Sequence, residues 1–510
     1  MLKKSLINVL LLVIFLMGCA PQTSVPAEPV TFSVLYNDRQ ASPFKSDWRI
    51  LEEYKKRQNV TLDVRLGDDA DYEKAVIQAL ESGDPPDIIL KVWPKTIESY
   101  ASAGVLLPFS DYEKLMPNFT AYIKENNLQA ELDKLRLSNG KYYILPGYQR
   151  KIQVQQWIYR RDIFEKNNLA MPATYEELFN SLVELKKIYP DSTPISTLWG
   201  GAHLFAMMGA GYGIPAGWAG TNYYNAAEDR WQFSPATKNY KALYTFLNRC
   251  YEAGILDPAS LTQSDADFYK KIEDGRAFVT VTWITSGFGT WNAKLKENGI
   301  ADGEWAVLPV PESTLAIKAL PPVDPFRKGL VVPSRVVNKP YFEDLLKFLD
   351  WAVYSEEGRT LTTWGVEGLT FEKTADGKVY LPNIKTPKNK NGTLEIGKEY
   401  GFDLLFNLNE NVEFEDYKKP AEIVAFLDRS FKAQDAMEMS PQLKLDAQSI
   451  EAIRIINEKI DPYVAEMSTK FITGELNMDT DWDAYLLELE KRGYKTLEEI
   501  WNDAWKKQRQ

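Results

Sequence analysis

The sequence of 510 residues contains a single histidine, His203. This scarcity excludes most imidazole chemistry: a zinc site built on histidines, a nucleophile activated by histidine, and a relay of several histidines. No nucleophile elbow, phosphate-cradling glycine-rich loop or zinc signature is present either. We therefore expect a structural role for His203. Glycoside hydrolysis stays open as an alternative, because it needs only two carboxylates and the chain has 71 acidic residues.

Cysteine is also scarce, with only Cys19 and Cys250 in the chain. Lys3 and Lys4 precede an apolar run that ends at Met17, which is too short to span a bilayer and is typical of a secretory signal peptide, residues 1–18. The segment from Leu16 to Cys19 resembles a bacterial lipobox, in which Cys19 becomes the lipidated first residue. An ordinary signal peptide with a chance cysteine is the alternative. With Cys19 lipidated, no internal disulfide can form.

The residues after Cys19 predict a flexible tether. Residues 19–30 are rich in proline, serine, threonine and alanine, a composition that does not build a packed core. No later apolar run is long enough to span a membrane.

An excess of positive charge is absent. The 60 basic and 71 acidic residues give a formal net charge of -11, which argues against binding to a phosphate backbone, so no nucleic-acid partner is expected. Aromatic residues make up 13% of the chain. They fit either large cores or a carbohydrate site, where apolar sugar faces stack on aromatic rings.

A chain of this length predicts two or more domains. The first segments alternate strand and helix patterns, which predicts a parallel sheet covered on both faces, with ligands beyond the carboxyl ends of the strands. Lys91, Trp93 and Lys95 follow such an end, and for Trp93 cleft and core are equal alternatives. The expected elements are strands at Thr31–Tyr36, Val60–Leu66 and Asp87–Leu90 and helices at Ser46–Gln58 and Asp71–Glu81.

A second stretch predicts a crossing between two lobes. Asn139-Gly140 is a strong turn signal, and a β-rich segment follows it. We expect Gly140–Pro146 to end the first lobe, Gly147–Gln153 to cross, and Trp157–Asp162 to begin the second. The polar and aromatic side chains of the crossing either face a ligand or hold the hinge.

Several segments, in order along the chain, resemble extracellular solute-binding proteins (family 1) of sugar ABC importers. The loop Trp364–Gly368 is similar to the long oligosaccharide-binding branch of alginate-binding proteins and Gram-positive sugar-binding lipoproteins. The segments that carry the resemblance are Gly83–Ile89, Ala103–Phe109, Gly140–Pro146, Tyr159–Leu178, Tyr354–Gly368, Lys470–Gly474 and Trp482–Gly493.

The resemblance implies an α/β fold of two lobes, the type II periplasmic-binding-protein-like fold, with a ligand cleft between the lobes. It assigns residues 31–148 and 305–355 to the N-lobe and 149–304 and 356–510 to the C-lobe. It also implies a monomeric, non-enzymatic lipoprotein without a cofactor, anchored through Cys19 on the extracellular face of the cell membrane. Such a protein delivers an oligosaccharide to an ABC permease; carbohydrate sensing or, less expected, glycoside hydrolysis are the alternatives.

The resemblance also suggests ligand-binding residues, although each aromatic one fits a core equally well. Arg150 has the further alternatives of pairing with an anionic sugar or with a hinge carboxylate. The expected set is Trp93 as a wall, Tyr148, Gln149, Arg150 and Trp157 as the floor, Trp199, Trp283 and Trp364 as stacking faces, and Glu367 as a hydrogen-bond acceptor.

Two segments bear on metal binding. Asp479, Asp481, Asp483 and Glu490 have the spacing of calcium-loop ligands, but Ala484 stands where that loop needs glycine, so the start of a helix is favoured. The stretch 189–196 lacks the calcium loop of the alginate-binding proteins. No metal site is expected.

Overall fold

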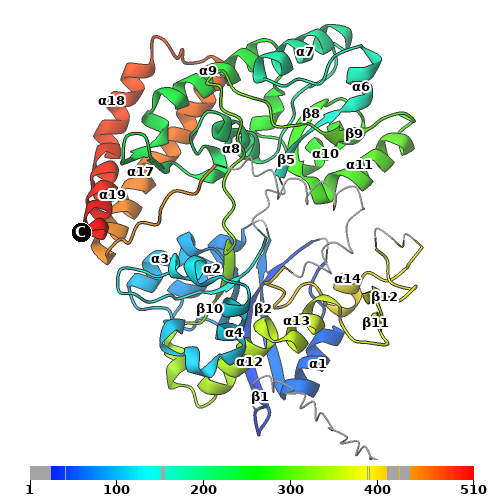
Figure 1. The fold of residues 1–510 in the computed structure, drawn as a ribbon, viewed down its shortest axis with the longest axis vertical. Helices are drawn as coiled ribbons and strands as arrows, with labels where there is room; N and C mark the ends of the chain where they lie inside the picture. The colour runs from blue at the N-terminus through cyan, green and yellow to red at the C-terminus, as the bar shows by residue number, and fades with distance from the viewer. Residues whose placement is uncertain are drawn as a thin grey trace, which may run out of the picture.

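The computed structural model describes residues 25–510 apart from 41, 70, 151–154, 387–388, 390, 411–423 and 425–436; of residues 284–289 it describes only the backbone. The chain forms two α/β lobes, one above the other in Figure 1. The predicted signal peptide, Cys19 and the start of the tether lie outside the described residues. Within the described ranges, no helix combines the length and apolarity that a membrane span needs.

The first lobe is built on a five-stranded sheet with strand order β2-β1-β3-β10-β4. The predicted alternation is confirmed, because β1 pairs in parallel with both β2 and β3. The last two strands, β10 and β4, are antiparallel to their neighbours. The elements are β1 (Val30–Asp38), α1 (Arg49–Gln58), β2 (Val60–Asp68), α2 (Tyr72–Glu81), β3 (Ile88–Val92), α3 (Pro94–Ser102), α4 (Pro117–Glu125), α5 (Gln129–Asp133), β4 (Leu145–Gly147), β10 (Lys328–Val331), α12 (Phe342–Tyr354) and α13 (Glu356–Thr363).

The first lobe also contains the segment that follows α12, which corrects the predicted boundary at residue 356. Phe402, Leu405 and Phe406 belong to the same buried cluster as Phe32 of β1. The Tyr54 hydroxyl donates to the Leu405 carbonyl at 3.3 Å. These apolar side chains are therefore part of the first-lobe core. The small elements of this segment are β11 (Phe371–Thr374), β12 (Gly377–Tyr380) and α14 (Ile396–Tyr400).

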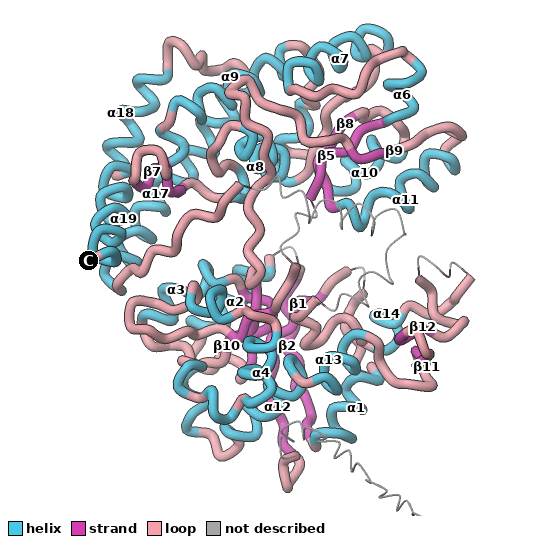
Figure 2. The backbone as a smooth tube through the Cα atoms, in the orientation of Figure 1, coloured by secondary structure: helices cyan, strands magenta, loops and turns pink. Residues whose placement is uncertain are grey.

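The second lobe holds a three-stranded sheet in the order β8-β5-β9, surrounded by helices (Figure 2). Trp305 of β9 pairs with Arg160 of β5, so the expectation that residues 305–310 return to the first lobe is wrong. The return lies between Leu320, buried in the second lobe, and Phe326, buried in the first. The elements before the return are β5 (Gln155–Arg160), α6 (Arg161–Lys166), α7 (Tyr175–Ile188), α8 (Ala202–Gly211), β6 (Asn222–Asn225), β7 (Arg230–Phe233), α9 (Lys238–Glu252), α10 (Asp265–Glu273), β8 (Val279–Trp283), α11 (Ile284–Glu297) and β9 (Trp305–Val307).

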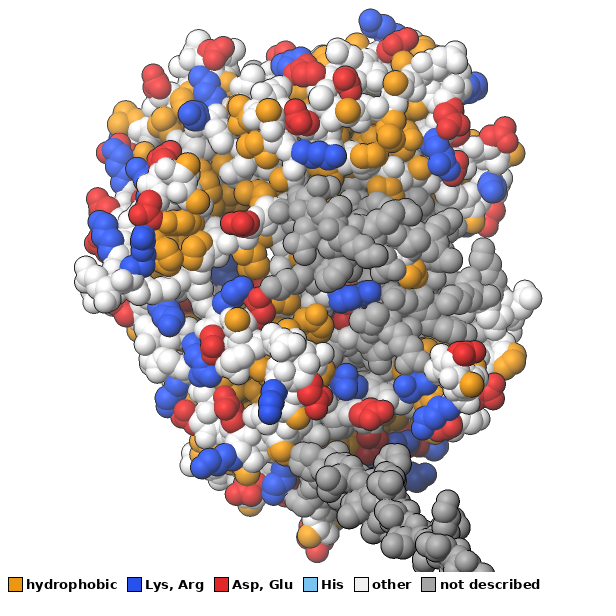
Figure 3. All heavy atoms as spheres, in the orientation of Figure 1, with side chains coloured by type: hydrophobic (Ala, Val, Ile, Leu, Met, Phe, Trp, Pro, Cys, Tyr) orange, Lys and Arg blue, Asp and Glu red, His pale blue; other side chains and the backbone are white. Residues whose placement is uncertain are grey.

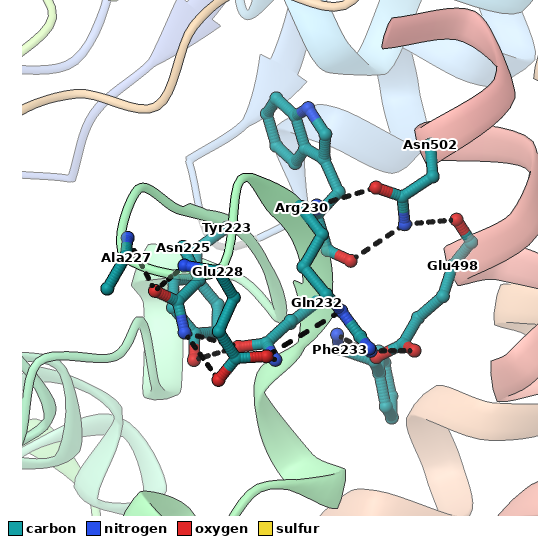
Figure 4. Close-up of polar contacts among 10 residues, drawn as sticks. Tyr223, Asn225, Ala227, Glu228, Arg230, Gln232, Phe233, Glu498 and Asn502 are labelled. Carbon is teal, nitrogen blue, oxygen red and sulfur yellow. Dashed lines mark hydrogen bonds and ion pairs between the residues drawn. The ribbon is translucent and has the colours of Figure 1, made fainter. Parts of the chain in front are cut away.

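The C-terminal helices α17 (Ala447–Thr473), α18 (Trp482–Arg492) and α19 (Tyr494–Arg509) complete the second lobe. Figure 4 shows how α19 holds the β6–β7 hairpin. Glu498 accepts the Phe233 backbone N–H at 2.8 Å, and the Asn502 amide both accepts from and donates to the Trp231 backbone at 2.9 Å. Side chains of α19 thus satisfy a strand edge that would otherwise be unpaired.

Candidate ligand-binding cleft

A cavity of about 560 Å³ lies between the two lobes, a size typical of small-ligand sites. Both lobes contribute to its walls, so a molecule inside it would touch both. Its described lining consists of Asn37, Arg39, Asp69, Tyr72, Glu73, Lys91, Trp93 and Lys328 from the first lobe and Trp199 and Trp283 from the second.

The first-lobe wall forms where the parallel strands end. Arg39 follows β1, Asp69 follows β2, and Trp93 follows β3. Lys328 joins them because β10 runs antiparallel and therefore begins at the edge where the others end. Of the three residues expected near this strand end, Lys91 and Trp93 line the cavity. Lys95 lines a different depression, between α3 and the C-terminal segment. The same strand-end rule, applied to β1 and β2, would have found Arg39 and Asp69.

The second-lobe wall is an aromatic cluster centred on His203. The Trp199 and Trp283 rings each lie 4.6 Å from the His203 ring and 5.4 Å from each other, measured between centroids. His203 Nδ1 is 3.0 Å from the Gln155 amide nitrogen. Burial, assisted by the positive charge of Arg327, lowers the His203 pKa to about 4. At neutral pH the imidazole is therefore uncharged and supports the two indoles.

Trp218 and Arg327 extend this cluster, and sequence reasoning missed both. The Trp218 ring is 6.3 Å from that of His203, and the Arg327 guanidinium lies 5.5 Å from the Trp218 centroid. Burial lowers the pKa of Arg327. A signal for Trp218 was its position between Gly217 and Gly220, which both take positive φ in a tight turn.

The backbone that presents Trp199 is strained. Trp199, Gly200 and Gly201 have φ of 51°, 62° and 83°, three left-handed residues in succession. This conformation suits the glycines but is unfavourable for tryptophan. It leaves Trp199 48% exposed at the cavity. Strain of this kind gathers at ligand sites, where the fold enforces a side-chain position.

The predicted floor residues Tyr148, Gln149 and Arg150 hold the hinge in the described structure. The Tyr148 backbone N–H donates to Asn409 Oδ1 at 2.9 Å, and the Gln149 amide donates to the Asp324 carbonyl at 2.9 Å. Arg150 Nε donates to Glu410 at 2.8 Å. These bonds link the crossing after β4 to the segment that returns to the first lobe and to the residues that follow Leu408 of the first-lobe core. None of the three residues lines the cavity, and residues 151–154 of the crossing lie outside the described ranges.

Two predicted aromatic contacts are wrong, because the side chains are in cores. Trp157 of β5 is 1% exposed and packs 5.7 Å from the Tyr175 ring. Trp364 has no exposed surface and packs 5.0 Å from the Tyr380 ring. Neither ring offers a face to a sugar. The predicted tight loop does exist, since Gly365 and Gly368 have positive φ, but it turns the indole inward.

Glu367 also lies away from the cavity. Its carboxylate pairs with Lys373 at 3.2 Å and lines a separate depression on the first lobe, beside β11 and β12. The prediction that it faces the same ligand as Trp199 and Trp283 is therefore wrong.

The acidic residues with calcium-loop spacing do not converge. Asp479 pairs with Lys241 at 3.4 Å, Glu490 pairs with Lys495 at 2.6 Å, and Asp481 accepts the Asn477 backbone N–H at 2.8 Å at the start of α18. Across the part of the chain that the structure describes, no cluster of three or more potential metal ligands occurs. On the face drawn in Figure 3, basic and acidic side chains are interspersed rather than gathered by sign.

The chain is similar in sequence to known binding proteins. A family model described as bacterial extracellular solute-binding protein matches residues 49–355. The fructooligosaccharide ABC transporter substrate-binding protein FusA of Streptococcus pneumoniae serotype 4 is 23% identical over 445 residues, 81% of this chain and 78% of that protein. The polygalacturonan/rhamnogalacturonan-binding protein YtcQ of Bacillus subtilis is 22% identical over 46% of each chain.

Solved structures share the fold over almost the whole chain. The alginate-binding protein AlgQ2, solved without calcium, superposes with a TM-score of 0.79 at 17% identity, covering 95% of this chain and 99% of that one. The S. pneumoniae FusA complex with kestose gives 0.74 at 21% identity, covering 94% and 99%. The predicted two-lobed α/β fold is confirmed.

Proposed function

Because the chain belongs to the bacterial extracellular solute-binding protein family, we propose that it captures an oligosaccharide between its two lobes and delivers it to an ABC permease. The observation that carries this proposal is the inter-lobe cavity, with indole faces on one wall and charged groups on the other. Indole faces suit the apolar faces of sugar rings, and polar groups suit the hydroxyls.

Capture depends on a ligand that touches both walls. Such a ligand makes its full set of contacts only when the lobes are close together, so it binds the closed arrangement more tightly than the open one. The lobes would turn about the crossings at 147–150 and 321–326, the first of which is bonded to Asn409 and Glu410. No covalent step is needed, and no catalytic residue is assigned.

A thermal-shift screen against diverse oligosaccharides tests this proposal. A ligand at 100 times its dissociation constant stabilises the folded state by about 2.7 kcal/mol, so a true ligand should raise the melting temperature. Tryptophan fluorescence should change in parallel, because Trp199 and Trp283 line the cavity. Release of smaller sugars during incubation would favour a glycoside hydrolase, and a response to peptides alone would overturn the proposed ligand class.

We further propose that Cys19 carries a lipid anchor that holds the protein on the extracellular face of the membrane. Replacing Cys19 with serine should move the protein from the membrane fraction to the culture medium and abolish labelling with palmitate. Cys250→Ser is the matched control: Cys250 is buried in the second lobe and should leave the membrane fraction unchanged. Equal membrane association of Cys19→Ser and wild type would contradict the anchor.

A further inference from the structure

Lys91 is a buried lysine at the wall of the cavity. Its side chain is 6% exposed and its ammonium lies 5.6 Å from the centroid of the Tyr36 ring. Among the described residues, no hydrogen bond and no ion pair reaches Nζ. A buried ammonium ion that lacks a hydrogen-bonded counter-charge is unfavourable, so an anion that enters the cavity and reaches Nζ would stabilise the charged form.

The backbone at Lys91 is distorted in a way that aims the side chain. Val92 pairs with Gly329 and Ile89 pairs with Val331, so β3 has an extra residue between these pairs. Lys91 falls in this bulge and has a φ of 53°, which is unfavourable for lysine. Bulges re-aim side chains and gather next to functional sites. The distortion and the missing partner are independent observations at the same residue.

The charged side chains of the cavity are gathered on one wall. Its described lining contains the cations Arg39, Lys91 and Lys328 and the anions Asp69 and Glu73, three against two. All five belong to the first lobe. The lining residues of the second lobe, Trp199 and Trp283, are both aromatic. A ligand in the cavity therefore meets charged groups on one side and two indoles on the other.

We propose that the ligand is an acidic oligosaccharide, whose singly charged anionic substituent, a carboxylate or a sulfate ester, binds Lys91 while a sugar ring contacts Trp199 and Trp283. This inference rests on the proposed function and narrows it to one substrate class. The anion supplies the hydrogen-bonded counter-charge that the described residues do not provide to Nζ.

Protonation of Lys91 gives this proposal a signature that a neutral ligand lacks. Burial lowers the Lys91 pKa to about 7; Arg39 and Lys328 lower it further, whereas Asp403 and Asp69 oppose the shift. An anion at Nζ favours the charged form and raises this pKa, so binding at pH 8 takes up a proton. The charged and titratable groups that face Lys91 are Tyr36 of β1, Arg39 after β1, Asp69 after β2, Tyr72 and Glu73 of α2, Lys328 of β10, and Asp403 after α14.

The test uses the full-length mature protein and titration calorimetry. The probes are uronic-acid trisaccharides, their carboxyl-reduced counterparts, and sulfated trisaccharides of the same length. The acidic member of a pair should bind at least about tenfold more tightly than the reduced one. At pH 8, binding should take up close to one proton, measured in buffers of different ionisation enthalpy. Preference among the acidic probes separates carboxylate from sulfate as the substituent.

Lys91→Met is the decisive variant, since methionine keeps the shape and removes the charge. It should abolish both the preference for the acidic probe and the proton uptake. Because the described residues give Nζ no hydrogen bond or ion pair to lose, the melting temperature of the variant should not fall. Lys95→Met is the matched control: Lys95 lies four positions along the chain and outside the cavity, so the variant should behave as wild type.

Two results overturn the inference while leaving the proposed function intact: equal affinity for acidic and carboxyl-reduced probes, or a preference that persists in Lys91→Met. Binding of no saccharide of either kind would instead overturn the proposed function.

Discussion

Replacing Trp283 with alanine is expected to weaken oligosaccharide binding by about 2–3 kcal/mol, roughly 30- to 150-fold. Trp283 ends β8 at the edge of the second-lobe sheet and lines the cavity directly. Buried tryptophans in binding sites carry a large share of the affinity, because one rigid side chain supplies a large contact area.

The loss should exceed that of a single contact, since Trp283 also supports its neighbours. Its ring meets those of Trp199 and His203 at 5.4 and 4.6 Å. Without it, the strained Trp199 loses a ring that holds it at the cavity wall. Affinity is measured by titration calorimetry with the saccharide that the thermal-shift screen identifies.

Two further variants make this result interpretable. Trp283→Phe keeps an aromatic face and should recover part of the affinity. Trp505→Ala removes an indole from α19, far from the cavity lining, and should bind as wild type does. Unchanged affinity in Trp283→Ala would place the ligand elsewhere.

Replacing Asp350 with alanine is expected to lower the free energy of unfolding by about 3–5 kcal/mol. Asp350 lies on α12 without exposed surface, and its carboxylate accepts hydrogen bonds at the start of α4. The donors are the Phe119 backbone N–H at 2.7 Å, the Asn118 backbone N–H at 3.1 Å and the Asn118 side-chain amide at 2.7 Å. The first N–H groups of a helix have no partner within it, so alanine would leave these donors unsatisfied.

The measurement is denaturant unfolding followed by fluorescence. Glu343→Ala, on the same helix, is the control, because its ion pair with Lys347 is exposed and should contribute within about 0.5 kcal/mol. Equal stability of Asp350→Ala and wild type would show that the start of α4 finds other partners.

The Asp350 carboxyl should also make the stability of the protein depend on pH. Burial raises the Asp350 pKa to about 6, against the opposing effect of its three hydrogen bonds. An unfolded aspartate has a pKa of about 3.9, so the folded state binds the proton more tightly. The contribution of the neutral carboxyl to stability is therefore present below about pH 4 and lost as pH rises through about 6. Asp350→Asn, which does not titrate, should lack this decline between pH 4 and 6.

The fold of the first lobe could be predicted from local pattern. The spacing of the apolar residues predicts the alternation of β1, α1, β2, α2 and β3. These five elements appear where they were expected. A strand of three residues is too short for its apolar pattern to predict its place in a sheet. Residues 305–307 of β9 read as a strand, but only pairing with Arg160 of β5, far away in the chain, decides the lobe to which it belongs.

Some residues of the candidate site could be predicted from the sequence and others could not. Trp93 and Lys91 could be placed because they lie at the carboxyl end of a strand whose direction was predictable. Trp364 could not, because the glycines of its loop specify a tight turn without specifying which way the indole points. That direction depends on Phe371 and Tyr380, which form a small core only after β11 and β12 pair.

The family resemblance and the two-lobed α/β class could be inferred from the sequence alone, since they depend on composition and on motifs in order along the chain. Three features emerge only in the folded chain: Phe402, Leu405 and Phe406 pack in the first lobe, Arg150 pairs with Glu410, and Trp199, Trp283 and Lys91 line one cavity. These outcomes depend on contacts between residues far apart in the chain, and no local pattern encodes them.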